Sequence, residues 1–83
     1  MKLDIKTIKI NMIVNFVRDY LTIREISSVS VIYDSKKLYI SMSNGMCGSD
    51  MEINVGSILL DTDIENSMHD LIAKIETHLS KHF

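Results

Sequence analysis

Apolar and polar residues alternate in the middle of the chain, on both sides of a short polar break at residues 34–37. A period of two over two short runs predicts two half-buried strands joined as a hairpin. The residues expected to face the core are Val29, Val31, Tyr33, Leu38, Ile40 and Met42.

The register of this hairpin follows from its turn. If Asp34 lies opposite Lys37, the apolar residues of the two strands meet on one face, whereas a slip of one residue would expose half of them. The expected pairs are Tyr33 with Leu38, Val31 with Ile40 and Val29 with Met42. The opposite face then pairs Ile32 with Tyr39 and is mixed in polarity.

A third strand is predicted after residues 44–48, NGMCG, whose glycines and asparagine favour a loop with positive φ. Its apolar residues alternate with polar ones, and their expected partners are Met42 for Met51, Ile40 for Ile53 and Leu38 for Val55. Gly56 interrupts the alternation. Residues 57–60 either bend and continue the strand or form a packed connector.

The segment from about Thr7 to Leu21 has helical periodicity, with Thr7 as the expected cap. Its apolar residues cover an arc of about 200° around the helix axis, whereas one buried face needs about 100°. They are Ile10, Met12, Ile13, Val14, Phe16, Val17, Tyr20 and Leu21. Such a helix either packs between two layers of its own domain or has an apolar flank that a partner covers. Residues 1–7 fit a short strand or the start of this helix.

The last segment predicts an amphipathic helix. Thr62 and Glu65 form a capping box, and apolar residues follow at helical spacing. The apolar stripe consists of Ile64, Met68, Leu71, Ile72, Ile75 and Leu79. The element order is then helix, three antiparallel strands, helix. Two helices on one face of the sheet would bury that face, so we expect a two-layer α+β fold, formed as a single domain by residues 1–83.

Composition narrows the class of protein. The chain has 83 residues, enough for one core, and its eleven acidic and nine basic residues provide no overall attraction to phosphate. No apolar run approaches the roughly 18 residues that cross a bilayer, and the N-terminal sequence lacks the features of a signal peptide. We therefore expect a cytoplasmic protein that does not insert into a membrane.

Cysteine and histidine give few signs of catalysis or metal binding. Cys47 is the only cysteine, so it forms no intramolecular disulfide, and it is a candidate nucleophile only if a base reaches it. His78 and His82 lie four residues apart and could share a metal, but no further ligand is placed to complete a site. We expect no enzyme activity, no catalytic residue, no metal or other cofactor and no small-molecule substrate.

Basic residues gather near the N-terminus and at the first hairpin turn, at Lys2, Lys6, Lys9, Lys36 and Lys37. The predicted element order resembles the double-stranded-RNA-binding domain and the small Alu-binding subunits of the signal recognition particle. Those families meet phosphates with lysines at the start of the closing helix or on the sheet. Here the closing helix starts with the acidic residues Asp61, Asp63 and Glu65. Nucleic-acid binding by the lysines is therefore the alternative function.

The main functional hypothesis follows from the surplus of apolar surface on the first helix and on the outer face of the sheet. Exposed apolar patches often mark contact sites, and the six methionines suit an adaptable surface. We expect a non-enzymatic binding module, an adaptor, inhibitor or regulatory protein, whose partner is another protein or a second copy of the chain. The expected contact residues are Phe16, Tyr20, Ile32 and Tyr39.

Overall fold

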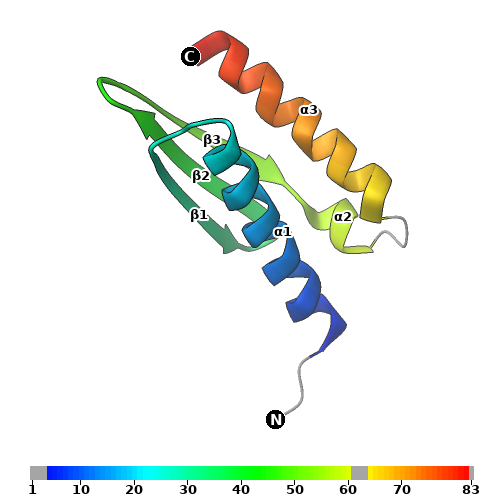
Figure 1. Cartoon of the computed structure of the whole chain (residues 1–83). Coiled ribbons are helices and arrows are strands. Elements are labelled where there is room, and N and C mark those ends of the chain that lie inside the picture. The colour runs from blue at the N-terminus through cyan, green and yellow to red at the C-terminus, as the bar shows by residue number, and fades with distance from the viewer. Residues whose placement is uncertain (1–3, 61–63, 83) are drawn as a thin grey trace.

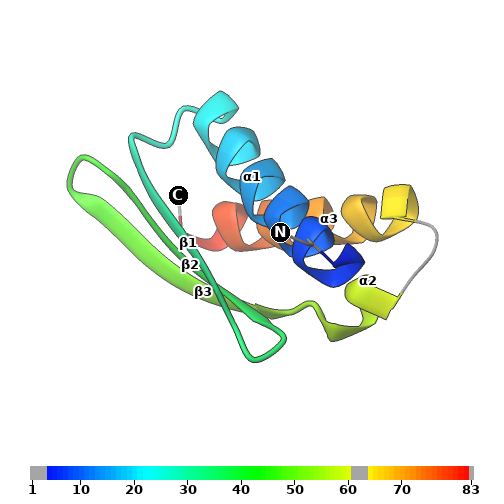
Figure 2. The same ribbon diagram turned by 90° about the horizontal axis from the view of Figure 1, so that it is seen from below.

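A three-stranded antiparallel sheet with two long helices on one face forms the protein (Figure 1 and Figure 2). The computed structural model describes residues 4–60 and 64–82. Its elements are α1 (Ile5–Ile23), β1 (Ser28–Asp34), β2 (Lys37–Asn44), β3 (Cys47–Asn54), α2 (Gly56–Leu60) and α3 (Ile64–His82). The strands follow one another in the sheet, in the order β1-β2-β3. The predicted fold class is confirmed, with α2 as an additional short helix.

Helix α1 begins at Ile5, and its cap is Asp4 rather than Thr7. The Asp4 carboxylate accepts a hydrogen bond from the Thr7 backbone N–H at 2.7 Å. This bond satisfies one of the amides that the first turn leaves free, and it lowers the pKa of Asp4. The prediction that Thr7 caps the helix is therefore wrong, because the cap lies three residues earlier. Residues 1–7 fitted either a short strand or the start of the helix; within the described residues, Ile5–Thr7 is helical.

The register of β1 and β2 is as predicted, with Asp34 opposite Lys37 and Val31 opposite Ile40. The turn between them consists of Ser35 and Lys36, which both have positive φ, 51° and 68°. Two positive φ values in a two-residue loop are the requirement of a type I′ turn, whose twist matches that of the strands. The chain adopts this turn without the glycine that usually occupies it.

The predicted register of β2 and β3 is wrong by two residues. Ile40 lies opposite Met51, not Ile53, and Ile53 lies opposite Leu38. The reason is a shorter connection than expected, because Asn44 already pairs with Cys47 and only two residues form the turn. The first of them is a glycine with a φ of 69°. A shift of two preserves the side-chain alternation, so the apolar residues of β3 still face the core.

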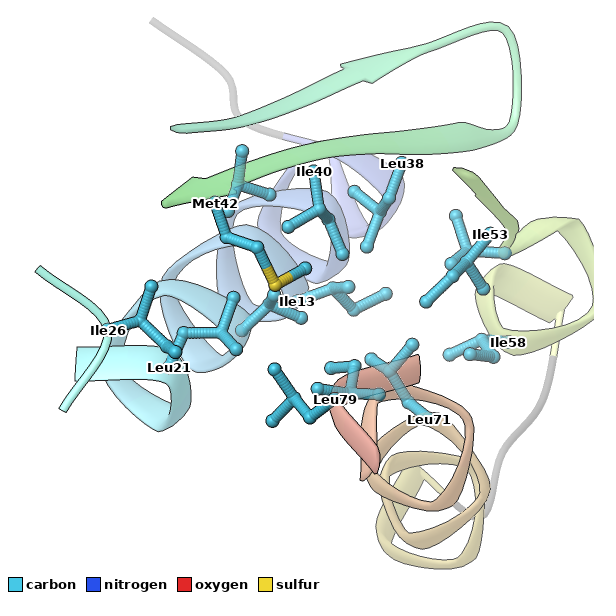
Figure 3. Close-up of a cluster of buried hydrophobic side chains, with 14 residues drawn as sticks. Ile13, Leu21, Ile26, Leu38, Ile40, Met42, Ile53, Ile58, Leu71 and Leu79 are labelled. Carbon is cyan, nitrogen blue, oxygen red and sulfur yellow. The ribbon is translucent and has the colours of Figure 1, made fainter. Parts of the chain in front are cut away.

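The core lies between the sheet and the two long helices (Figure 3). Side chains of β2 point toward those of α1 and α3, and Ile58 of α2 closes one end, so residues 57–60 form a packed connector. The predicted stripe of α3 is buried at three positions, Leu71, Ile75 and Leu79. Thr62 of the predicted capping box lies outside the described residues. The buried apolar residues are Ile13, Val17, Leu21, Ile26, Val31, Leu38, Ile40, Met42, Ile53, Val55, Ile58, Leu71, Ile75 and Leu79.

Replacing Ile40 by alanine should lower the free energy of unfolding by about 3 kcal/mol, since the side chain is only 1% exposed and its loss leaves a cavity. That is a large share of the roughly 4–12 kcal/mol that stabilises a domain of this size. Urea denaturation would measure the change as a lower midpoint at an unchanged slope.

The matched control is Ser41→Ala, because Ser41 is the next residue of β2 and lies on the opposite, exposed face. This change should alter stability by less than about 0.5 kcal/mol. Equal effects of the two substitutions would contradict the assignment of the inner face.

A candidate binding groove between two helices

Two apolar stripes run along α1. The first, Ile13, Val17 and Leu21, is buried under the helix. The second consists of Ile5, Ile8, Met12 and Phe16 and lies roughly 130° further around the helix axis. Ile5 is 72% exposed and Met12 48% exposed, and Phe16 is half-buried. The wide apolar arc predicted for this helix therefore contains one face that is buried in the core and one that is largely exposed, of which only Phe16 packs partly against the core.

The second stripe borders a groove between α1 and α3 with a volume of about 630 Å³. Met12 and Phe16 from α1 face Met68 and Ile72 from α3 across it. The two helices run in the same general direction (Figure 1). The remaining described lining residues are Asn15, Asp19, Glu65 and His69, so this lining combines an apolar surface with two carboxylates and includes no lysine or arginine.

Polar contacts join the two helices one turn beyond Phe16. The Tyr20 hydroxyl donates a hydrogen bond to Glu76, and Arg24 forms an ion pair with the same carboxylate at 2.9 Å, with a second bond at 3.1 Å. The bond from Tyr20 lowers the pKa of Glu76 and raises that of Tyr20. The Tyr20 ring also stacks on Phe16, with 6.4 Å between centroids. These contacts, which we call the Glu76 clamp, limit the groove at one end.

The four residues expected to contact a partner lie on two faces of the molecule. Phe16 and Tyr20 belong to α1 beside the groove and the Glu76 clamp. Ile32 and Tyr39 are direct cross-strand partners on the outer face of the sheet, 59% and 40% exposed. The structure therefore brings each pair together but separates one pair from the other by the thickness of the domain.

The lysines proposed for nucleic-acid binding also lie at two separate places, a pocket near the start of α1 and the outer face of the sheet. Lys6, Lys9 and Lys36 line a pocket of about 360 Å³ together with Ile5, Gly56 and Leu59, and Lys9 donates a hydrogen bond to the Leu59 carbonyl at 3.3 Å. Lys37 lies on the outer face of the sheet and forms an ion pair with Glu52 at 2.7 Å, which raises the pKa of Lys37. Lys2 lies outside the described residues.

Two of the three histidines, His78 and His82, form a polar cluster where α3 meets β3. His78 Nε2 lies 2.7 Å from the Ser49 hydroxyl, and the His78 and His82 rings have their centroids 4.3 Å apart. Among residues 4–60 and 64–82, no group of three metal-ligating side chains comes together. Cys47 is an exposed free thiol at the start of β3.

The sequence reasoning did not single out the residues that form the groove with Phe16. Those residues are Met12, Asn15, Asp19, Glu65, Met68, His69 and Ile72. A signal was present, because Met12 and Phe16 are spaced by four, as are Met68 and Ile72, and such pairs share one side of a helix. Each helix thus carries a second apolar pair beside its core stripe.

No family model matches the chain, and no curated protein or solved structure is significantly similar to it. None of the described helices combines the length and the apolar character needed to span a bilayer.

Acidification from pH 7 toward pH 5 should destabilise the fold through His78. Burial, and then the nearby His82 and Lys81, lowers the pKa of His78 below the usual value of about 6.5. The unfolded chain therefore binds a proton at His78 more readily than the folded protein does. Stability is lost as the pH falls from the unfolded pKa to the folded pKa, and no more is lost through this group below that.

Thermal denaturation at a series of pH values measures this dependence. His78→Gln keeps a polar group near Ser49 but does not titrate, so its stability should vary less between pH 7 and pH 5 than that of the natural protein. An equally steep loss in the variant would assign the effect to other groups.

Proposed function

We propose that this protein is a non-enzymatic binding module that holds an amphipathic helix of another protein in the groove between α1 and α3. The observation that carries the proposal is the apolar surface left open between the two helices, which Met12, Phe16, Met68 and Ile72 line. Helix-in-groove recognition uses such a surface, with apolar residues of the incoming helix at spacings of three and four.

The side chains of the groove suit a helical ligand. Methionine has three rotatable bonds and adapts its shape, so Met12 and Met68 can fit against side chains of different size. Phe16 supplies a large apolar surface and is held by stacking on Tyr20. A ligand that covers the groove removes this surface from water, which is the favourable term in binding.

The charge of the groove favours a basic partner over a second copy of the chain. Asp19 and Glu65 line it, and its described lining includes His69 but no lysine or arginine. Two copies that met groove to groove would place these carboxylates against each other, whereas a helix with lysine or arginine beside its apolar stripe would complement them. The proposed ligand is therefore a basic amphipathic helix.

The alternative function is binding of nucleic acid, supported by the convergence of Lys6, Lys9 and Lys36 around one pocket. Phosphate binding weakens steeply with salt because counterions are released, whereas apolar association does not. A salt titration of any nucleic acid bound, with Lys6→Ala and Lys36→Ala as variants, tests this alternative separately.

A synthetic peptide can test the groove. The probe is an amphipathic helix of about 18 residues, or five turns, with leucines on one side and lysines on the flanks. It should shift the backbone amide signals of residues 12–19 and 65–72 in NMR spectra. Replacing its lysines by glutamates should weaken binding roughly tenfold, because charge at the rim of an interface controls encounter and register.

Reversal of the rim charges supplies the matched variant. In Asp19→Lys/Glu65→Lys the preference should invert, so that the glutamate peptide binds more tightly than the lysine peptide. Ile32→Ala, on the far face, should change neither affinity. Shifts that map to another surface, or a preference that the reversal leaves unchanged, would reject the groove as the site.

A further inference from the structure

Strand β1 is an edge strand without the features that usually protect an edge. It pairs with β2 on one side, and Figure 1 shows it at the border of the sheet away from α3. Proteins discourage edge-to-edge pairing with proline, lysine, bulges or very short edge strands. β1 has seven residues, SVSVIYD, with no proline and no lysine, and its pairing with β2 is continuous. Its one charged residue, Asp34, is at the turn.

The backbone of β1 offers hydrogen-bonding groups at this edge. In an antiparallel ladder alternate pairs exchange both bonds, and the pair that closes a two-residue turn is a bonded one. Asp34 with Lys37 is that pair here, so Ile32 and Ser30 also bond β2. Val29, Val31 and Tyr33 then direct their N–H and C=O groups away from the sheet.

The series of bonds on the other side of β2 supports this assignment. The Val55 N–H donates to the Lys36 carbonyl at 2.8 Å, which continues the ladder between β2 and β3. Even-numbered residues of β2 therefore bond β3, which leaves its odd-numbered residues to bond β1.

The sequence of β1 is complementary to itself. With Val31 placed opposite Val31 of a second antiparallel copy, Val29 lies opposite Tyr33 of that copy on the inner face. On the outer face Ser30 meets Ile32, and Ser28 meets Asp34. Each inner pair consists of residues whose backbone groups point outward, so every one of these pairs can exchange both hydrogen bonds. Val29 and Tyr33 are only partly buried in one copy, and this contact extends their burial.

Strand β3, at the opposite edge of the sheet, is not complementary to a second copy of itself. β3 carries Asp50 and Glu52 on its outer face. A two-fold pairing centred on Met51 would place Asp50 beside Glu52 of the second copy, and one centred on Asp50 would place two aspartates together. Like charges directly opposite each other destabilise a strand pair. Charge therefore distinguishes β1 from β3 as the edge that can accept a second copy.

We infer that two copies of this chain associate through antiparallel pairing of their β1 strands, centred on Val31, to form one continuous six-stranded sheet. The two-fold axis is perpendicular to the sheet, so the helices of both copies lie on the same side. Because α1 packs on β1, the α1 helices of the two copies come next to each other across the axis, whereas the groove lies on the α3 side of α1, so each copy keeps its own groove. The inference is independent of what the groove binds.

Sedimentation equilibrium over a range of concentrations tests the pairing. The natural chain should form a dimer, and Ser30→Lys/Ile32→Lys should raise the dimer dissociation constant by roughly tenfold or more, since each lysine at 30 meets a lysine at 32 of the other copy. Both positions are on the exposed outer face, so each monomer should fold. Circular dichroism and a urea midpoint check that it does.

The matched control is Tyr39→Lys/Ser41→Lys, which places the same charges on the cross-strand neighbours of these two residues in the central strand. It should dimerise as the natural chain does. Hydrogen exchange of the natural chain gives a second, mutation-free readout: the amides of Val29, Val31 and Tyr33 should become protected as the protein concentration rises. A natural chain that stays monomeric, a dimer that resists the double lysine variant, or amides at these three residues that exchange freely in the dimer would overturn the inference.

Discussion

The contact between α1 and the inner face of the sheet is the interaction on which the rest of the structure depends. α1 packs chiefly on β1, whereas α3 packs on β3, at the other edge. A sheet of three strands is wide enough to hold the two helices over its opposite edges. The surfaces of α1 and α3 that point away from the sheet therefore do not pack against each other. The groove is therefore a consequence of the spacing that the sheet imposes on the helices and not of any residue inserted between them.

Polar groups join the two helices at one end of the groove. The Glu76 clamp joins α1 to α3, and both Arg24 and Glu76 are partly exposed to water. Ion pairs of this kind add little to stability, so their main effect is on geometry: they fix the angle and register of the helices at one end. Met12 and Met68 line the other part of the groove, and both side chains can change conformation readily.

The sequence was sufficient to predict the fold class and the β1–β2 register, because alternation of apolar residues and the turn at Asp34 agree on one solution. It failed at the β2–β3 register, where a slip of two residues leaves the same side chains inside and so carries no signal in the pattern. Of the groove, it identified Phe16 and the excess of apolar surface on α1. It assigned Met68 and Ile72 to the core stripe of α3 and not to a groove, since their position relative to α1 depends on the distance between the helices, which the pattern does not contain.

The three strands are joined by two turns of two residues each, whereas the helices that form the groove come from opposite ends of the chain. Closing short turns costs little chain entropy, so the meander of strands can form early, and the long-range encounter of α1 with α3 has to follow it. A chain emerging from the ribosome would have its sheet and first helix before it had any groove. The groove can therefore form only after α3 has been made and has packed on the sheet.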